Sequence, residues 1–168
     1  FALQRAGLPE AESKEMFIQA GHVCAFNTFG GIMSSPEWHA VVEPFCDNRE
    51  DWFHGLIAVL NTLGWGIFRL EKIAVEQELI VRLYNAYEGV GYRRLYNDLA
   101  ADKNISFLAM GAVLGMVHLL WKVDIRTQPT LNQEFYVQQF NNPENSYHVE
   151  QTHAIADGDA FDRFVVSK

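Results

Sequence analysis

The side chains best suited to chemistry in this sequence lie near its carboxyl end. His148, Glu150 and His153 fall within six residues of one another, in a segment of strand-like composition. Imidazole and carboxylate groups are common ligands of transition metals, so this spacing raises the hypothesis of a metal site. Strand alternation, however, places His148 and Glu150 on one face and turns His153 to the other. The pattern therefore favours polar residues of an exposed strand, and we expect no metal site.

A second candidate is His118, which lies in an apolar segment at residues 105–121. From the wall of a pocket, its imidazole could bind the metal of a haem or a chlorin. A lone buried histidine more often donates a hydrogen bond to a backbone carbonyl, and this second interpretation is favoured. His22 and His54 are weaker candidates, because neither has an acidic residue at a useful spacing.

No catalytic or nucleotide-binding motif is recognisable. The sequence contains no GxSxG, HExxH, phosphate-loop or GxGxxG pattern. A reductase would need a hydride donor, and nothing resembles a nicotinamide or flavin site. We therefore predict no catalytic residues and no required cofactor, and the sequence leans away from an enzyme.

Composition narrows the class of protein. The 168 residues, 49% of them hydrophobic, suit a single folded domain over residues 1–168. The net charge of −8 and the scattered basic residues argue against nucleic acid and against an anionic membrane surface. Cys24 and Cys46 have no metal-binding spacing. We expect them to be reduced, buried thiols of a cytoplasmic protein.

The elements that would position these residues divide the chain at residue 64. Residues 1–63 are predicted to be helical, with a first helix at 9–31, a second that starts at Ser35-Pro36-Glu37 and a third from Asp47 or Asn48 to Leu63, before Gly64. Beyond them, further helices are predicted from residue 86 to 99 and over 105–121. Strands are predicted at 67–72, 79–84, 134–140, 147–156 and 160–166. Asp157-Gly158 predicts a tight hairpin turn between the last two strands.

The apolar segment 105–121 has 17 residues without a charge and includes Gly111 and Gly115. Glycines at this spacing occur at the contacts of membrane helices. The segment is short for a membrane span and contains Ser106 and His118, so a buried central helix is favoured and no membrane span is expected. The two glycines would then either allow close packing or leave room for a ligand. We expect them to make room.

Several segments resemble, in order, the 4-vinyl-reductase (hydrocarbon-binding) domain family. They are Gly64-Trp65-Gly66 at the start of a strand, a strand that ends in Asn85-Ala86-Tyr87-Glu88, the helix with Gly111 and Gly115, and a final hairpin with Glu150, Gly158-Asp159 and Phe164. The resemblance covers roughly residues 60–167. It implies a mixed α+β fold, in which helices pack on one face of a twisted antiparallel sheet, usually in a dimer. It also implies an apolar cavity between these layers.

The resemblance further implies what such a cavity could hold. Relatives are credited with binding aromatic effectors or acyl chains, or with a role in tetrapyrrole synthesis. Many hold a structural zinc through cysteines, and the positions matching those cysteines here are Ser106, Ala154 and Asp162. These residues supply one carboxylate at best, so no structural zinc is expected.

These observations favour a non-catalytic domain that binds a small hydrophobic or aromatic molecule between sheet and helices, as a sensor, carrier or regulatory subunit. One alternative is a tetrapyrrole-biosynthesis accessory protein or vinyl reductase, with a tetrapyrrole or lipid-like ligand. Another is a structural assembly subunit. A homodimer or a place in a larger assembly is expected. The candidate ligand-binding residues are Trp65, Phe107, Met110, Gly111, Leu114, Gly115 and His118.

Overall fold

The computed structural model describes residues 6–96, 105–140 and 147–168, and it confirms the mixed α+β class and the helical N-terminal part. The helices are α2 (Glu10–Met33), α3 (Pro36–Val41), α4 (Arg49–Leu60), α5 (Tyr87–Tyr96), α6 (Phe107–Val117) and α7 (Gln133–Phe140). The strands are β1 (Ile67–Ala74), β2 (Glu78–Tyr84), β3 (His148–His153) and β4 (Asp162–Ser167). Short helical turns are η1 (Glu43–Phe45), η2 (His118–Lys122), η3 (Ile125–Thr127) and η5 (Ile155–Asp157).

Capping side chains start the two helices α3 and α4 where the sequence predicts. The Ser35 hydroxyl accepts a hydrogen bond from the backbone N–H of Trp38 at 3.1 Å. Asn48 and Asp51 form a reciprocal capping box at the start of α4. This helix ends at Leu60, three residues before the predicted end. Its C-cap residue Asn61 instead pairs with Phe68 at the start of the sheet, accepting from the backbone N–H at 2.7 Å and donating to the carbonyl at 3.2 Å.

The four strands form one antiparallel sheet in the order β1-β2-β4-β3, and its inner face contributes to the core. Strand register places Val81 opposite Phe164, and both are fully buried. On the outer face Arg82 lies opposite Arg163. The Glu71 carboxylate accepts from both, with Arg82 Nε at 2.5 Å and Arg163 Nη2 at 2.9 Å. One acid thus offsets the repulsion between two directly opposed cations.

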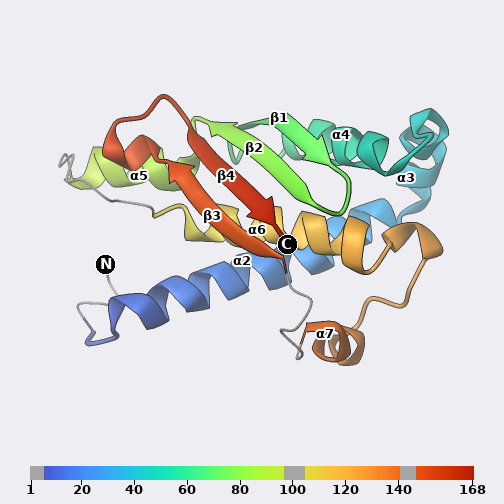
Figure 1. Cartoon of the computed structure of the whole chain (residues 1–168), viewed down its shortest axis with the longest axis horizontal. Coiled ribbons are helices and arrows are strands. Elements are labelled where there is room, and N and C mark those ends of the chain that lie inside the picture. Colours follow the sequence, from blue (N-terminus) through green and yellow to red (C-terminus); the bar gives the residue numbers. More distant parts are fainter. Residues whose placement is uncertain (1–5, 97–104, 141–146) are drawn as a thin grey trace.

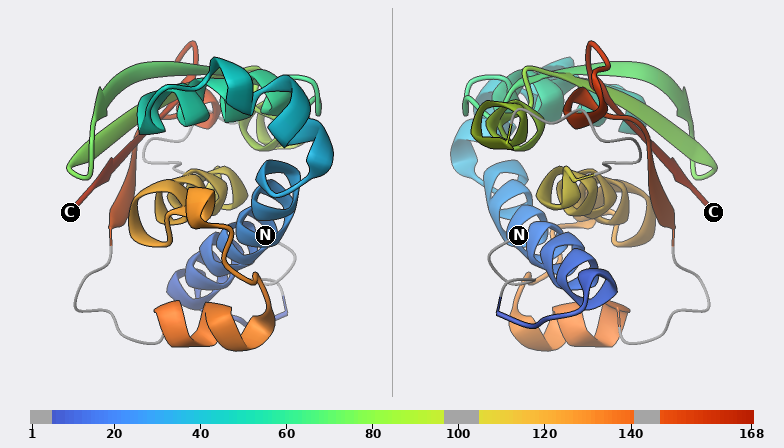
Figure 2. Two further views of the ribbon diagram at one scale, coloured as in Figure 1. Left: turned by 90° about the vertical axis from the view of Figure 1, so that its right-hand side faces the viewer. Right: turned by 90° about the vertical axis from the view of Figure 1, so that its left-hand side faces the viewer.

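Helix α6 is the centre of the molecule. In both end views of Figure 2 the sheet curves over one side of α6, while α2 crosses its other side. Figure 1 shows α7 on the far side of α2 from the sheet. The segment 105–121 is therefore the buried helix that its composition predicts, continued as the π-helical turn η2. No helix among the described residues is long and apolar enough to span a membrane.

The glycines of α6 serve close packing against α2. A Cβ atom at Gly111 would overlap the carbonyl oxygen of Ile18 and lie 2.7 Å from the backbone nitrogen of His22. At Gly115 it would lie 2.8 Å from the Cβ of Ala25. The expectation that these glycines leave room for a ligand is therefore wrong, because the backbone and side chains of α2 occupy that space.

Residues 134–140 are predicted as a strand but form helix α7. The Asn132 side chain caps this helix, accepting from the backbone N–H of Phe135 at 2.8 Å. On the face toward α2, the Tyr136 and Phe140 rings meet the buried Phe26 ring at centroid distances of 5.2 and 5.4 Å. Docking of this aromatic face on α2 overrides the strand-like composition.

The predicted two-residue turn at Asp157-Gly158 is also wrong. The connection between β3 and β4 spans residues 154–161 and contains η5, and only Gly158 of the pair has a positive φ, at 105°. Two acids stabilise this wider loop. Asp159 Oδ2 accepts from the N–H of Ala154 at 2.8 Å, and Asp162 Oδ1 accepts from that of Ile155 at 2.6 Å.

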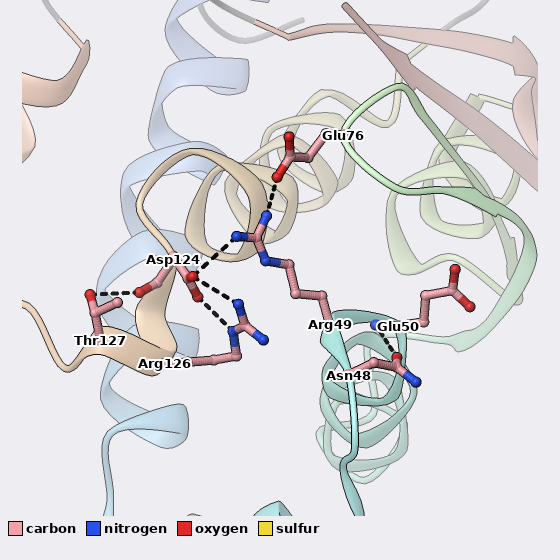
Figure 3. A network of polar contacts seen from close by, with 7 residues as sticks. All are labelled: Asn48, Arg49, Glu50, Glu76, Asp124, Arg126 and Thr127. Atoms are coloured by element: carbon pink, nitrogen blue, oxygen red, sulfur yellow. Dashed lines mark hydrogen bonds and ion pairs between the residues drawn. The ribbon is translucent and has the colours of Figure 1, made fainter.

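An ion-pair network holds the end of η2 against α4 and the first hairpin (Figure 3). Arg49 at the start of α4 pairs with Glu76 in the β1–β2 turn and with Asp124 Oδ2 at 3.2 Å. Arg126 holds the same Asp124 carboxylate through two hydrogen bonds, at 2.7 and 2.8 Å. These contacts lower the pKa of Asp124, the Arg126 hydrogen bond most. Asp124 itself has a left-handed backbone conformation, with φ of 51°, two residues after the π-helical turn.

Both cysteines are free. Cys46 is half-buried, but Cys24 is exposed on α2, so the expectation of two buried thiols is wrong for Cys24.

Candidate ligand-binding site

Three side chains from distant parts of the chain form a hydrogen-bonded row at the C-terminal end of α6. His22 of α2 lies at its centre. Its Nε2 is 2.6 Å from Nδ1 of His118 in η2, and its Nδ1 is 2.7 Å from the hydroxyl of Tyr136 in α7. Both imidazoles are buried, with 6% of His22 and 4% of His118 exposed. We call these three residues the imidazole row.

Both histidines of the row are neutral at pH 7. Burial lowers the pKa of His22 to about 4 and that of His118 to about 3, and the nearby Lys122 ammonium acts in the same direction. A neutral imidazole carries one N–H and one acceptor nitrogen. If the Tyr136 hydroxyl donates to His22 Nδ1, then His22 Nε2 donates to His118 Nδ1. The hydrogen of His118 is in that case on its Nε2. In the reverse arrangement, His118 Nε2 is an acceptor.

The row ends on a nitrogen that lacks a partner. Within the described residues, His118 Nε2 is buried and makes no hydrogen bond. A buried polar atom left unpaired costs about 1–3 kcal/mol, so its presence calls for an explanation. Trp121 Nε1 is also unpaired, three residues further along. The Tyr147 ring lies against both side chains, with centroids 5.9 Å from His118 and 5.5 Å from Trp121.

A hollow of about 310 Å³ opens beside the imidazole row, between α2, the α6–η2 segment and α7. We call it the α2–α7 hollow. Ile18, Leu114 and Phe140 give it apolar walls. Glu15 and Lys122 are its charged lining residues. A pocket with apolar walls and a few converging polar groups is the usual form of a small-molecule site.

The structure brings together only part of the predicted site. Leu114 and His118 line the α2–α7 hollow, whereas Met110, Gly111 and Gly115 are buried within α6. Phe107 begins α6, eleven residues before His118, which is roughly 16 Å along a helix axis. Its ring lies 5.9 Å from the ammonium of Lys14. The half-buried Trp65 packs near Phe29, at a centroid distance of 6.1 Å.

Sequence reasoning missed two members of the row. In sequence His22 is a weak candidate because no acid lies at a useful spacing, and the residue pattern predicts a strand for the segment of Tyr136. Their partners are 96 and 114 residues away in sequence, so only the packing of α2 against η2 and α7 brings them together. The one local signal was Asn132, whose capping side chain marks the start of the helix that carries Tyr136.

The carboxyl-end group of histidines and acid lies on the surface of the sheet edge. His148, Glu150 and His153 are all exposed on the edge strand β3, and a register shift after Gln151 interrupts the strand alternation. The His153 ring stacks on Phe161 at a centroid distance of 5.4 Å. No group of three or more histidine, cysteine or acidic side chains placed to hold a metal occurs among the residues that the structure describes.

The N-terminal end of α6 carries a second buried polar cluster. The Ser106 hydroxyl donates to Asp162 Oδ2 at 2.6 Å, and Gln151 Oε1 accepts from the Ser106 N–H at 3.3 Å. Glu88 accepts from the first free N–H groups of the helix, those of Leu108 at 3.1 Å and Ala109 at 2.9 Å. Burial raises the pKa of Glu88 to about 7 and also raises that of Asp162. Two of the three positions matched to zinc cysteines, Ser106 and Asp162, thus bond to each other.

A larger hollow, of about 550 Å³, lies over α3, η1 and α4. Its lining includes the half-buried Cys46, whose thiol has a raised pKa because of burial and nearby acids. A thiol with a raised pKa is a poor nucleophile. Several of its apolar lining residues are strongly exposed, such as Phe45 at 83%, and none carries an unpaired buried polar atom. The α2–α7 hollow is therefore the better candidate site.

Comparisons with known proteins give a likeness in fold. No family model matches the sequence and no curated protein matches it, so the resemblance to 4-vinyl-reductase domains stays a prediction. Among solved structures, the chain is similar to the phenol-responsive sensory domain of the transcription activator PoxR, in a crystal structure with phenol. The TM-score is 0.59 at 9% sequence identity, over 92% of this chain. The chain spans 63% of that PoxR chain.

Proposed function

We propose that this domain binds a small aromatic molecule in the α2–α7 hollow and acts as a sensor or carrier without catalysis. The observation that carries the proposal is the unpaired, buried Nε2 of His118, at the end of a hydrogen-bonded row that otherwise satisfies its members. A polar group of a ligand would complete this row. The similar fold of a domain that responds to phenol supports the same class of function.

The size of the hollow favours a single-ring ligand. Ligand pockets commonly enclose roughly 300–1,000 Å³, and the hollow of about 310 Å³ is at the lower end of this range. A tetrapyrrole macrocycle is a poor match for that volume. The Phe140 ring and the Leu114 and Ile18 side chains offer the apolar contacts that an aromatic ring needs. Association with a second copy of the chain stays a prediction.

The test is calorimetric titration of the protein with toluene, phenol, benzamide and benzoate, beside a variant in which the hollow is filled. Leu114 is half-buried in the wall of the hollow, so Leu114→Trp should occupy the space of the ligand. We expect at least one of the four compounds to bind the wild type with one site per chain. The Leu114→Trp variant should lose that binding.

The control is Val137→Trp, which adds the same side chain on α7 at a position that is 41% exposed and outside the lining of the hollow. This variant should bind as the wild type does. Equal binding by Leu114→Trp and Val137→Trp would place the ligand elsewhere. Absence of binding for all four compounds would refute the proposed function.

A further inference from the structure

A half-buried lysine lines the α2–α7 hollow. Lys122, the last residue of η2, is half-buried in the lining of the hollow. Its ammonium lies 5.0 Å from the centroid of the Phe140 ring, and it forms no ion pair within the described residues. Burial lowers its pKa, which means that part of its hydration is lost.

The same lysine acts on the imidazole row. Its positive charge contributes to the lowered pKa of both His22 and His118. The ammonium is therefore close enough to the row for its field to add to the effect of burial, which is the main reason that the imidazoles are neutral. A neutral His118 whose Nε2 carries the proton can donate one hydrogen bond. The residues that line the hollow thus include a cation and, in this tautomer, a histidine donor whose nitrogen is buried, together with aromatic and aliphatic side chains.

These are the partners that a small aromatic acid requires. We propose that the hollow selects molecules with one aromatic ring and an ionised carboxylate, in which the carboxylate pairs with Lys122 and accepts a hydrogen bond from His118 Nε2. The inference rests on the proposed function, since it names the class of ligand for the same hollow. A charge-assisted hydrogen bond at a partly desolvated site is roughly twice as strong as a neutral one, which gives the acid its advantage over neutral analogues.

Among the described residues, Glu15 is the one acid that lines the hollow, and it opposes an anionic ligand. Its side chain is on the exposed face of α2, where water screens its charge. Lys122 is half-buried by comparison, so its attraction for a carboxylate should exceed the repulsion from Glu15. The proposal therefore predicts opposite effects for neutralising these two residues.

The experiment compares benzoate with benzamide, which has nearly the same shape and no charge. Calorimetric titrations at pH 7 would use the wild type, Lys122→Met, Glu15→Gln and the control Lys14→Met. Lys14 is an exposed lysine near the Phe107 ring, so its loss changes the net charge equally without touching the hollow. Circular dichroism melts would confirm that each variant is folded.

We expect the wild type to bind benzoate at least about tenfold more tightly than benzamide. Lys122→Met should remove this preference while benzamide binding stays the same. Glu15→Gln should tighten benzoate binding, and Lys14→Met should leave the ratio unchanged. A higher salt concentration should weaken the binding of benzoate and leave the binding of benzamide unchanged.

Equal or weaker binding of benzoate relative to neutral compounds would overturn this inference and leave the proposed function standing. So would a benzoate preference that survives in Lys122→Met. Failure of charged and neutral compounds alike would instead refute the proposed function, so the two outcomes are distinct.

Discussion

The two ends of helix α6 carry buried polar clusters that are built differently. At the N-terminal end, the Asp162 carboxylate uses both oxygens and Glu88 caps two backbone N–H groups. At the C-terminal end, the imidazole row finishes at His118 Nε2, which has no partner among the residues that the structure describes. A cluster whose polar atoms are all hydrogen-bonded stabilises the fold, whereas a cluster that ends on an unpaired atom has a hydrogen-bonding group left for a ligand. The comparison predicts that changes at the first end cost stability and changes at the second end cost binding.

The largest effect should come from the glycine contact that lies between the two ends. Gly111→Ala would push a methyl group into the backbone of Ile18 and His22, so we expect a loss of about 3 kcal/mol or more in the free energy of unfolding. The comparison is with Gly31→Ala, because Gly31 is exposed in α2 with open space at its Cβ position. That change should stabilise the protein by about 0.5–1 kcal/mol. Similar denaturation midpoints for both variants would contradict the packing described for α2 and α6.

Next in size is Asp162→Ala. It leaves the Ser106 hydroxyl and the Ile155 N–H buried without an acceptor, at a cost of about 3 kcal/mol. Asp157→Ala, at an exposed position of the same loop, should change the free energy of unfolding by less than about 0.5 kcal/mol. Urea denaturation of both variants measures the difference. Binding in the α2–α7 hollow should be unaffected in folded Asp162→Ala, and its loss would show that the two ends are not independent.

The two ends also differ in how far the sequence reveals them. Ser106 and Asp162 could be singled out from the resemblance, and the structure pairs them, although the resemblance says nothing of Glu88 as the helix cap. The imidazole row gives no comparable signal. His22 and Tyr136 acquire their roles from contacts with segments about a hundred residues away, and one wrong element, the strand predicted at 134–140, hid Tyr136.

The fold class could be predicted from local patterns in the sequence. Local structure follows from short-range features of the sequence. These are the caps at Ser35 and Asn48, the alternation in β1 and β2 and the apolar segment of α6. The role of Gly111 could not be predicted from the sequence, because a glycine in a helix is equally consistent with a neighbouring backbone and with an empty space. Only the position of Ile18 decides between them. Local patterns therefore predict elements, while the site depends on how those elements pack.

A third prediction is that the two ends respond to pH in opposite directions. The pKa of Glu88 is about 7 in the folded protein and about 4.5 in the unfolded chain, so its folded state binds more protons between these values. Its contribution is present below pH 4.5 and is lost as pH rises through 7, at a cost of about 3 kcal/mol. Glu88→Gln should abolish that loss.

The imidazole row behaves in the reverse manner. The pKa values of His22 and His118 fall from 6.5 to about 4 and about 3. Their contribution is present above pH 6.5 and is lost as pH falls toward 3. Chemical denaturation at intervals from pH 4 to 8 would separate the two trends. The prediction for Glu88 would be wrong if the stability of the wild type rose steadily from pH 5 to pH 8 and Glu88→Gln had the same profile. Glu88 would then not lose stabilising interactions as the pH rises.

The smallest effect on stability should come from His118→Phe at pH 7, and this makes it the sharpest test of the comparison. The substitution removes the unpaired Nε2 and leaves His22 Nε2 unpaired in its place, so the number of unsatisfied nitrogens in the row is unchanged. Phenylalanine occupies a similar volume, and the neighbouring Phe140 and Tyr147 rings can pack against it. We expect the free energy of unfolding to change by less than about 1 kcal/mol. Binding of the preferred aromatic compound should nevertheless weaken at least about tenfold, while His54→Phe, on the exposed side of α4, should leave both quantities unchanged. A loss of stability as large as that of Asp162→Ala would mean that His118 supports the fold in the same way as the N-terminal cluster, and the difference drawn between the two ends of α6 would disappear.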